Sequence, residues 1–552
     1  MKNSENRSRR PDHCGFTFRL LFGAAAICVF TLISAATASA DNSSHRPIAF
    51  TESGLVIGST MDGVNQFLGI PYAAPPVGAL RWRPPKRYGF FPGLVLQATQ
   101  FGSECTQAGG GSENCLFLNV FTPQRKSDDG WHHRDRRGLP VMFWIHGGGL
   151  INGSSTPYNP EQFVKKGVIV VTINYRLGFL GFFAQSAIDA EGHLSGNYGL
   201  MDQQFALGWV RRNIASFGGD PDRITIFGES AGGQSVYAQL ASPLASGMFR
   251  GAISESGSYA EFQNYFSNIV TLAVAETEGT TAVPSGAAIA DSIGCTDQTA
   301  ACLRAVPAST IVAAEPFPLY PFVDGTLLAQ TMSAAFASGE FNRVPVISGT
   351  NHDEYRLFVA LDYDLVENPI LNSAEYDTAV TALWGPALAS PVLALYSFAG
   401  YPNGGEALGA SGTDGVFSCA VRVADQSLAK FVPTYTYEFN DENAPPPQSA
   451  FGGLLTFPLG AYHSSELPYL FPGIDVFDLP VTLSSQQMEL SDAMVSYWTQ
   501  FAKTGDPNSP GEPFWSPYSA STDQFQSLIP PMPVVESNFD SSHRCSVFWD
   551  TF

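Results

Sequence analysis

The sequence predicts an α/β fold in which a mostly parallel sheet is covered on both faces by helices. Short apolar runs alternate with helix-compatible stretches, and four of these runs lie at residues 168–173, 224–227, 251–254 and 344–348. Strands of a parallel sheet are buried on both faces, so they read as continuous apolar runs. Neither an internal repeat nor a low-complexity linker divides the chain, and we therefore expect residues 41–552 to form a single domain.

The first 40 residues have the composition of a signal peptide. Basic residues are followed by an apolar run from Leu20 to Ile33 and by the small residues Ala38-Ser39-Ala40. We expect cleavage after Ala40 and export to a periplasm or to the outside of the cell. No later apolar run reaches the ~18 residues that span a bilayer, so the mature protein is expected to lack a membrane span.

An apolar run from Val141 to Ile145 is interpreted as a buried strand, and it ends in the loop His146-Gly147-Gly148-Gly149. Glycine lets the backbone approach a ligand closely and adopt positive φ, so consecutive amides of such a loop can bind an oxyanion. We assign an oxyanion hole to the N–H groups of Gly148 and Gly149, together with that of Ala231. His146 is interpreted as a hydrogen-bonding brace for the loop rather than as a proton carrier.

The six residues from Gly228 to Gly233 (Gly-Glu-Ser-Ala-Gly-Gly) follow the run at 224–227 and precede a helix-compatible segment, Gln234 to Leu240. A Gly-x-Ser-x-Gly turn between strand and helix needs glycine at both flanks, because the central residue is held in a strained conformation. The pattern predicts a nucleophile elbow that exposes the hydroxyl of Ser230 at the N-terminus of a helix, where negative charge is stabilised.

A base and an orienting acid are expected to follow the serine in the order Ser, acid, His. Of the histidines beyond Ser230, His352 and His543 fit this order poorly, which leaves His463 in a glycine-containing loop. For the acid, the run at 344–348 leads to Asp353 and Glu354. Either carboxylate can orient an imidazole, and the residues alone do not choose between them.

The chain resembles the type-B carboxylesterases, the branch of the α/β-hydrolase superfamily that includes cholinesterases and fungal lipases. Besides the elbow, the resemblance covers nearly the whole mature chain. It is carried by the segments Phe67 to Pro76, Asn174 to Gly178, Asn197 to Gln203, Gly218 to Pro221 and Phe501 to Asn508.

The resemblance implies an α/β-hydrolase fold. From their content of glycine, alanine and proline, residues 280–290 and 443–453 are expected to be insertions at the carboxyl edge of the sheet that shape the pocket. In that family the acid is the glutamate of an Asp-Glu pair, which implies that Glu354 orients His463. The chain differs from the family at two places. Residues 113–116 are Glu-Asn-Cys-Leu where the family has Glu-Asp-Cys-Leu, and Leu150 follows the glycines where an aromatic residue is common.

Eight cysteines are present, and six of them lie beyond residue 40, an even number that suits an oxidising compartment. The resemblance implies three disulfides, which pair Cys105 with Cys115, Cys295 with Cys302, and Cys419 with Cys545. In family members with a lid or a gorge wall, the first pair closes a long loop. Here the loop from Thr106 to Asn114 is short and lacks aromatic residues, so we expect an open site without a lid and without the tryptophan that binds quaternary ammonium.

Charge and motifs exclude several other functions. The formal net charge is −21, and because the first 40 residues contribute five basic and two acidic residues, the mature chain carries about −24, which disfavours nucleic acid and anionic membranes as partners. No dinucleotide or phosphate-binding loop is present, and no cofactor is expected. The charged stretch from Lys126 to Arg137, which contains His132 and His133, is interpreted as a solvated loop, and no metal site is expected.

The sequence thus predicts a secreted serine esterase that hydrolyses small-molecule carboxylic esters through an acyl-enzyme. Two alternatives are weighed against it. Some relatives of this family use the fold for cell adhesion without a working nucleophile, and the same triad also supports amide hydrolysis or acyl transfer to an acceptor other than water.

Overall fold

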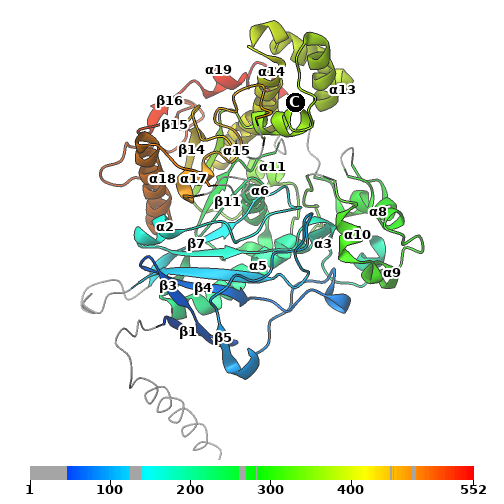
Figure 1. The fold of residues 1–552 in the computed structure, drawn as a ribbon, viewed down its shortest axis with the longest axis vertical. Coiled ribbons are helices and arrows are strands. Elements are labelled where there is room, and N and C mark those ends of the chain that lie inside the picture. The colour runs from blue at the N-terminus through cyan, green and yellow to red at the C-terminus, as the bar shows by residue number, and fades with distance from the viewer. Residues whose placement is uncertain are drawn as a thin grey trace, which may run out of the picture. The chain divides into compact units, whose positions relative to one another are not determined.

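Eleven strands of the described chain form one central sheet (Figure 1). The computed structural model describes residues 46–124, 138–259, 269–280, 283–316, 318–447, 451, 453–473 and 480–551. From edge to edge, the strands are β16 (Val534–Glu536), β15 (Phe525–Leu528), β14 (Thr434–Phe439), β13 (Val346–Asn351), β12 (Gly251–Glu255), β11 (Gly219–Glu229), β7 (Leu139–Ile145), β8 (Ile169–Ile173), β6 (Phe117–Pro123), β4 (Val64–Pro71) and β3 (Ser59–Met61).

The middle of the sheet is parallel and both edges are antiparallel. Strands β15, β14, β13, β12, β11, β7 and β8 pair in parallel, whereas β16 and the group β6, β4 and β3 run in the opposite sense to their neighbours. A smaller sheet is formed by β1 (Ile48–Thr51), β2 (Gly54–Ile57) and β5 (Val95–Gln97), and β9 (Phe182–Phe183) pairs with β10 (Gly196–Asn197). The predicted fold class is therefore confirmed, with antiparallel edges added.

Two hydrophobic cores cover the two faces of the sheet. In β7, Val141, Phe143 and Ile145 belong to one core, whereas Met142 and Trp144 belong to the other, as the alternation of side chains along a strand requires. All five side chains are fully buried, which explains why this strand reads as an unbroken apolar run.

Helices pack on both faces and extend beyond the sheet. They are α2 (Glu161–Lys165), α3 (Gly178–Gly181), α4 (Ser186–Asp189), α5 (Tyr198–Asn213), α6 (Ala231–Ala241), α7 (Leu272–Thr277), α8 (Gly286–Ser292), α9 (Ala300–Ala305), α10 (Ala308–Val312), α11 (Met332–Ser338), α12 (Tyr355–Val359), α13 (Ser373–Leu395), α14 (Gly404–Gly412), α15 (Cys419–Leu428), α17 (Leu467–Leu470), α18 (Ser485–Thr504) and α19 (Phe539–His543). Buried residues of α5, α6 and α11 belong to the first core, and those of α2 and α18 to the second.

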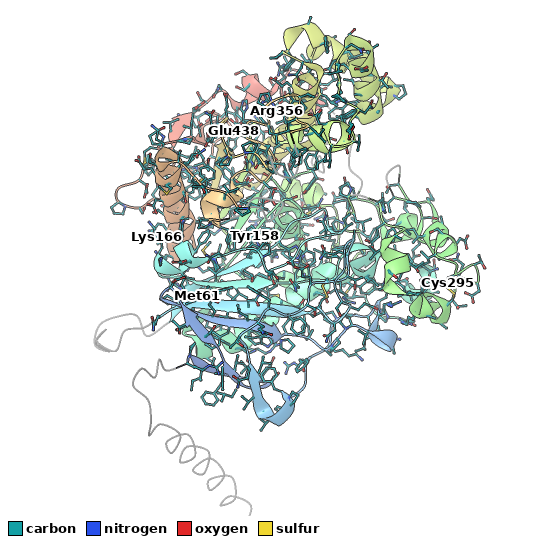
Figure 2. The ribbon with its side chains drawn as sticks, viewed as in Figure 1. Met61, Tyr158, Lys166, Cys295, Arg356 and Glu438 are labelled. Atoms are coloured by element: carbon teal, nitrogen blue, oxygen red, sulfur yellow. A yellow bond between two sulfur atoms is a disulfide. The ribbon has the colours of Figure 1, made fainter. Side chains whose placement is uncertain are left out.

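Helices α8, α9 and α10 form a group to one side of the sheet, where Figure 2 labels Cys295. Residues 280–290, which were predicted to be an insertion that shapes a pocket, lead into this group, and their described part includes the start of α8. Helix α8 begins at a serine cap, because the Ser285 side chain accepts a hydrogen bond from the amide of Ala288.

One helical stretch of the described chain, Ser373–Gly400, is long and apolar enough to cross a membrane by length and composition. Gly385 breaks it with φ 72° and ψ 164°, and Pro386 follows directly. The two pieces, 373–384 and 386–395, are each shorter than the ~20 residues that a membrane-spanning helix needs. About a third of the most apolar part of this stretch is buried within the protein.

A buried ion pair connects two of the segments that carry the family resemblance, Asn174 to Gly178 and Asn197 to Gln203. The Arg176 guanidinium donates to both carboxylate oxygens of Asp202, at 2.7 and 2.8 Å, and the Arg176 backbone amide donates to the same carboxylate. Because both side chains are almost fully buried, the pair satisfies charges that would otherwise be costly. It fixes the loop after β8 to helix α5.

Candidate active site

The loop between β11 and α6 holds Ser230 in a strained conformation. Ser230 has φ 60° and ψ −128°, outside the regions that L-residues favour, and it forms the N-cap of α6. A Cβ atom on Gly228 would lie 2.5 Å from the Ile145 carbonyl oxygen, and one on Gly232 would lie 2.0 Å from the same oxygen. The two glycines are therefore required by space at this turn.

His463 and Glu354 complete a hydrogen-bonded line from Ser230. The Ser230 hydroxyl donates to His463 Nε2 at 2.8 Å, and His463 Nδ1 donates to Glu354 Oε2 at 2.6 Å. The other carboxylate oxygen of Glu354 accepts from the Thr350 hydroxyl and the Asn351 amide, both at 2.8 Å. The three side chains come from distant parts of the chain and are all buried.

Asp353, the alternative acid, does not contact His463 in this arrangement. Its carboxylate accepts a hydrogen bond from the Ala461 amide at 3.0 Å and forms an ion pair with Arg356 at 2.9 Å. Its own amide donates to the Ala461 carbonyl. Asp353 thus anchors the loop that carries His463, and Gly460 has no room for a side chain because its Cβ would lie 2.1 Å from Asp353 Oδ2.

The glycine loop after β7 packs directly against the elbow. A Cβ on Gly147 would lie 2.9 Å from Ser230 Cβ, and Gly148 and Gly149 have φ of 99° and 62°. The Gly149 carbonyl accepts from the Leu319 amide, so the loop is tied to a neighbouring segment. Ala231 follows the nucleophile as the first residue of α6, which places its amide at the helix N-terminus.

His146 lies beneath this loop and stacks on Tyr175 with ring centroids 4.5 Å apart. Its Nδ1 donates to the Gly147 carbonyl at 2.9 Å. Burial lowers the pKa of His146 to about 4, so the ring is neutral near pH 7. These contacts hold the glycine loop in place, which is the supporting role predicted for His146.

Several buried carboxylates surround the imidazole. Glu229 Oε1 lies 3.3 Å from His463 Nε2 and accepts from the Ser464 hydroxyl, and Glu466 accepts from the Asn351 side-chain amide. Burial raises the pKa of Glu229 to about 7 and that of Glu466 to about 8. Burial acts to lower the pKa of His463, but the charges of Glu229 and Glu354 outweigh it and raise that pKa to about 9.

Aromatic side chains that sequence reasoning missed form a wall around the nucleophile. The Tyr259 hydroxyl hydrogen-bonds to Ser230 Oγ, and the rings of Phe358 and Phe417 each lie 5.1 Å from the His463 ring. Tyr259 follows the carboxyl end of β12, the strand beside β11, and that position is a signal for a site residue in a parallel sheet. Phe358 and Phe417 lie in helical segments that carry no comparable signal.

The model of the carboxylesterase family matches residues 45–547. The chain belongs to this family. The carboxylesterase is 33% identical to the para-nitrobenzyl esterase of Bacillus subtilis (strain 168) over 523 residues, which cover 91% of this chain and 98% of the relative.

Two further comparisons agree. An acylcarnitine hydrolase of Mus musculus is 33% identical over 514 residues and covers 86% of each chain. A solved structure of a PNB esterase superposes with a TM-score of 0.73 at 31% identity and covers 91% of this chain and all of its own. This carboxylesterase is therefore a serine hydrolase of carboxylic esters with an α/β-hydrolase fold.

Three disulfides are present in the described part of the carboxylesterase: Cys105–Cys115, Cys295–Cys302 and Cys419–Cys545. They pair the cysteines as the resemblance implied. In the loop closed by the first disulfide, Gln107 exchanges hydrogen bonds with the backbone of Gly153. This loop is thus fastened to the segment that follows the three glycines.

A small apolar pocket of the carboxylesterase, partly open to solvent, lies beside the glycine loop. Leu319, one of its lining residues, is the residue whose amide binds the Gly149 carbonyl. Most of the remaining lining is aromatic or aliphatic and comes from α3, β9, α7 and α8; it includes Phe179, Phe183, Ala275 and Ile289.

Two parts of the sequence interpretation fall outside the described residues. They are the signal peptide at 1–40 and the charged stretch from Lys126 to Arg137 with His132 and His133. The two histidines rejected as bases lie close to other acids: His352 lies beside Asp353, and His543 hydrogen-bonds to Asp414 and Glu438.

Proposed function

We propose that Ser230, His463 and Glu354 are the catalytic triad of this carboxylesterase and that the amides of Gly148, Gly149 and Ala231 form its oxyanion hole. The observation that supports this most directly is the continuous hydrogen-bonded line from the Ser230 hydroxyl through His463 to Glu354. A side chain that meets a base in this way, on a strained turn at a helix N-terminus, has the geometry of an activated nucleophile.

The proposed reaction has two acyl-transfer steps. Ser230 Oγ attacks the ester carbonyl carbon while His463 Nε2 takes the hydroxyl proton, and the oxyanion hole stabilises the tetrahedral intermediate. His463 then gives the proton to the departing alkoxide, which leaves an acyl-enzyme. A water molecule attacks the acyl carbon in the same manner and releases the acid, and the Ser230 hydroxyl is restored.

The assignment is tested with four variants of the purified enzyme. Ser230→Ala and His463→Ala are expected to lower kcat/KM for a soluble aryl ester by several powers of ten with an unchanged thermal unfolding midpoint. Glu354→Gln is expected to lower kcat by about 10³–10⁴-fold. Asp353→Asn is the matched control, because it alters the neighbouring carboxylate that anchors the His463 loop and is expected to lower stability more than kcat. Near-normal turnover by Ser230→Ala, or a larger loss of kcat in Asp353→Asn than in Glu354→Gln, would refute the triad.

We further propose that the substrates are soluble esters of small to moderate size and that no lid closes over the site. The loop between Cys105 and Cys115 is short, and its Gln107 is hydrogen-bonded to Gly153 in the segment that follows the glycine loop, which supports this proposal. Activity on a short-chain triglyceride is expected to rise smoothly through the solubility limit of the substrate. An abrupt increase at that limit would show interfacial activation and contradict the proposal.

We also propose that the enzyme is exported after cleavage following Ala40. The disulfides support export, since such bonds persist in oxidising compartments. N-terminal sequencing of the enzyme recovered from periplasmic and culture-medium fractions is expected to begin at Asp41. Retention of the first 40 residues on a cytoplasmic enzyme would contradict this.

A further inference from the structure

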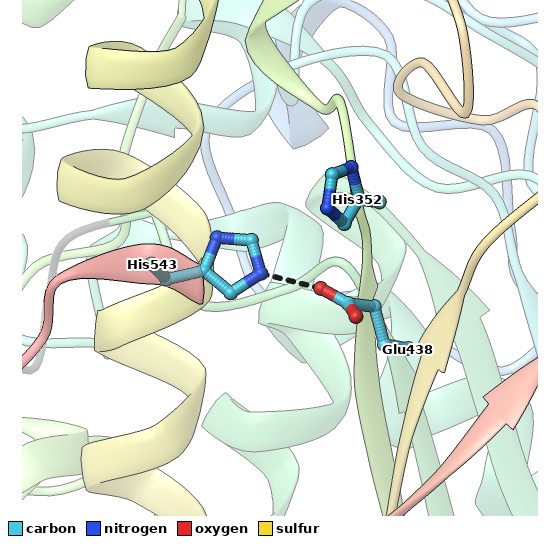
Figure 3. Close-up of side chains that lie close together, drawn as sticks. All are labelled: His352, Glu438 and His543. Atoms are coloured by element: carbon cyan, nitrogen blue, oxygen red, sulfur yellow. Dashed lines mark hydrogen bonds and ion pairs between the residues drawn. The ribbon is translucent and has the colours of Figure 1, made fainter. Parts of the chain in front are cut away.

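Two histidines and one glutamate from distant parts of the chain converge outside the proposed active site (Figure 3). His352 follows directly after β13, Glu438 lies on the neighbouring strand β14, and His543 is the last residue of α19. Pairing of the two strands brings the first two together, because the His352 amide donates to the Phe439 carbonyl at 3.0 Å. Each of the three residues offers one ligand atom, and these atoms lie within 4.8 Å of one another.

The three side chains differ in burial in a way that suits an accessible ion site. Glu438 and His543 are buried, whereas the His352 side chain is 38% exposed. Ligand atoms around a tetrahedral zinc ion lie roughly 3.3 Å apart, as follows from bonds of about 2.0 Å. To reach that spacing, His543 Nε2 and Glu438 Oε1, which are now in direct hydrogen-bond contact, must move slightly apart, and the partly exposed His352 ring must move toward them.

Further polar groups orient the three side chains. Asp414 Oδ1 accepts from His543 Nδ1 at 2.6 Å, and Asp353 Oδ1 lies 3.4 Å from His352 Nδ1. The carboxylate at His543 Nδ1 leaves Nε2 as the ligand atom of His543, whereas Asp353 lies close to His352 Nδ1 without a hydrogen bond to it. Asn440 binds one oxygen of Glu438 at 3.0 Å, and the other oxygen faces His543 Nε2. Carboxylates behind histidine ligands are a usual feature of zinc sites.

We propose that His352, Glu438 and His543 form a binding site for a divalent transition metal ion of the zinc class, with water as the fourth ligand. Two imidazole nitrogens and one carboxylate are the donors that zinc prefers, whereas calcium and magnesium prefer oxygen ligands. On binding, the metal replaces the hydrogen between His543 Nε2 and Glu438, and one proton is released to solvent.

The site joins two segments that matter to the enzyme. His352 lies two residues before Glu354, and His543 lies two residues before Cys545, which is bonded to Cys419 in α15. A bound ion therefore ties the loop after β13 to the C-terminal segment. Its role is to stabilise that junction, and no step of ester hydrolysis passes through it.

The competing interpretation is a buried ion-pair cluster in which His543 bridges Asp414 and Glu438 and no metal binds. The test uses the full mature enzyme, stripped with a chelator and dialysed against Zn²⁺, with bound metal measured by mass spectrometry and Co²⁺ binding followed by visible absorption. We expect one Zn²⁺ per chain, the intense absorption of a four-coordinate Co²⁺ site, and a higher thermal unfolding midpoint with Zn²⁺.

The variant that decides is His352→Ala, because this side chain is partly exposed and its loss leaves the contacts of His543 with Asp414 and Glu438 intact. It is expected to weaken Zn²⁺ binding by at least about 100-fold and to abolish the Co²⁺ absorption. His193→Ala is the matched control, since His193 is also partly buried beside a carboxylate, Glu191, and it is expected to bind as the wild type does. His543→Gln serves as a second ligand variant if it folds.

Three results would overturn the proposal. The first is a wild-type enzyme that retains no stoichiometric Zn²⁺ after dialysis. The second is equal Zn²⁺ affinity in the wild type and in His352→Ala, which would place the metal elsewhere. The third is loss of binding in His193→Ala to the same degree as in His352→Ala.

Discussion

Glu229 precedes the proposed nucleophile in the sequence, and in space its carboxylate faces the proposed base. Its Oε1 lies 3.3 Å from His463 Nε2, and a negative charge there stabilises the imidazolium. Burial raises the pKa of Glu229 to about 7, so its charge acts on His463 chiefly above that pH. The two groups therefore titrate as a pair.

This pairing predicts a shift in the pH dependence of Glu229→Gln. His463 must be neutral to accept the Ser230 proton, so kcat/KM rises with pH as the imidazolium loses its proton. The charges of Glu229 and Glu354 raise the pKa of His463 to about 9, and removal of one of them lowers it. The rising limb of the profile is expected to move to lower pH by roughly one unit or more. The measurement is kcat/KM for a soluble aryl ester across the pH range.

Glutamine keeps an oxygen that can accept from the Ser464 hydroxyl, so the variant removes charge with little change of shape. Glu489→Gln, on the exposed side of α18, is the control for loss of a carboxylate elsewhere. A limb that stays in place in Glu229→Gln, or that moves to higher pH, would show that this carboxylate does not act on His463.

At the level of single residues, the sequence predicted the members of the proposed triad and oxyanion hole but not the aromatic residues around them. The backbone conformations at Ser230 and in the glycine loop require glycines at fixed positions, and such glycines can be recognised in the sequence. Asp353 and Glu354 are adjacent and chemically alike, so only their contacts tell them apart: one binds the Ala461 amide and the other the imidazole. The wall residues Phe358 and Phe417 depend on how helices pack, which no short pattern encodes.

At the level of elements, helix α7 forms part of the apolar pocket beside the glycine loop. Ala275 on this helix lines the pocket and is 6% exposed, whereas Ala273 on the same helix is exposed. The pocket adjoins the loop proposed to bind the oxyanion, so we expect it to receive the acyl chain of the ester. Apolar lining of this kind binds ligands by burying their apolar surface.

Ala275→Phe is therefore expected to fill part of the pocket and to shorten the preferred acyl chain. In a series of aryl esters from acetate to octanoate, kcat/KM for the long chains is expected to fall about 10-fold or more while that for acetate changes little. Ala273→Phe adds the same side chain to the exposed face of α7 and is expected to leave the series unchanged. An equal loss for all chain lengths would exclude the pocket as the acyl site.

Several buried strands followed closely from the sequence, whereas the buried strands β14 and β15, which carry polar residues, were not predicted. Strand β7 was predicted from Val141 and begins two residues earlier, and β8 and β12 begin within one residue of their predicted starts. Strand β11 differs more: it begins at Gly219, five residues before the apolar run at 224–227 from which it was predicted, because that glycine pairs with Leu139 of β7. The edge strands β3, β4 and β16 were not predicted, since antiparallel strands at an edge are partly exposed and lack a continuous apolar run.

At the level of the whole molecule, the three disulfides constrain very different lengths of chain. Cys419–Cys545 closes a separation of 126 residues and ties α15 to the C-terminal segment, whereas Cys295–Cys302 closes a separation of 7 within the group of α8 and α9. A crosslink restricts the unfolded chain more when the loop it closes is longer. The first of these bonds therefore contributes to the stability of the central sheet, and the second acts locally.

Removal of the long-range bond is expected to destabilise the enzyme more than removal of the short one. The double variant Cys419→Ser with Cys545→Ser is expected to lose about 4–5 kcal/mol in the free energy of unfolding, roughly twice the loss in Cys295→Ser with Cys302→Ser. Thermal unfolding midpoints, measured with a chelator in every sample so that bound metal makes no difference, provide the comparison. Reduction of the wild-type enzyme should reproduce the larger effect, because it opens all three bonds. Equal midpoints for the two double variants would mean that the C-terminal segment is held by its packing alone. This segment has contacts that do not depend on the disulfide, because Trp549 is fully buried and Arg544 forms an ion pair with Asp414.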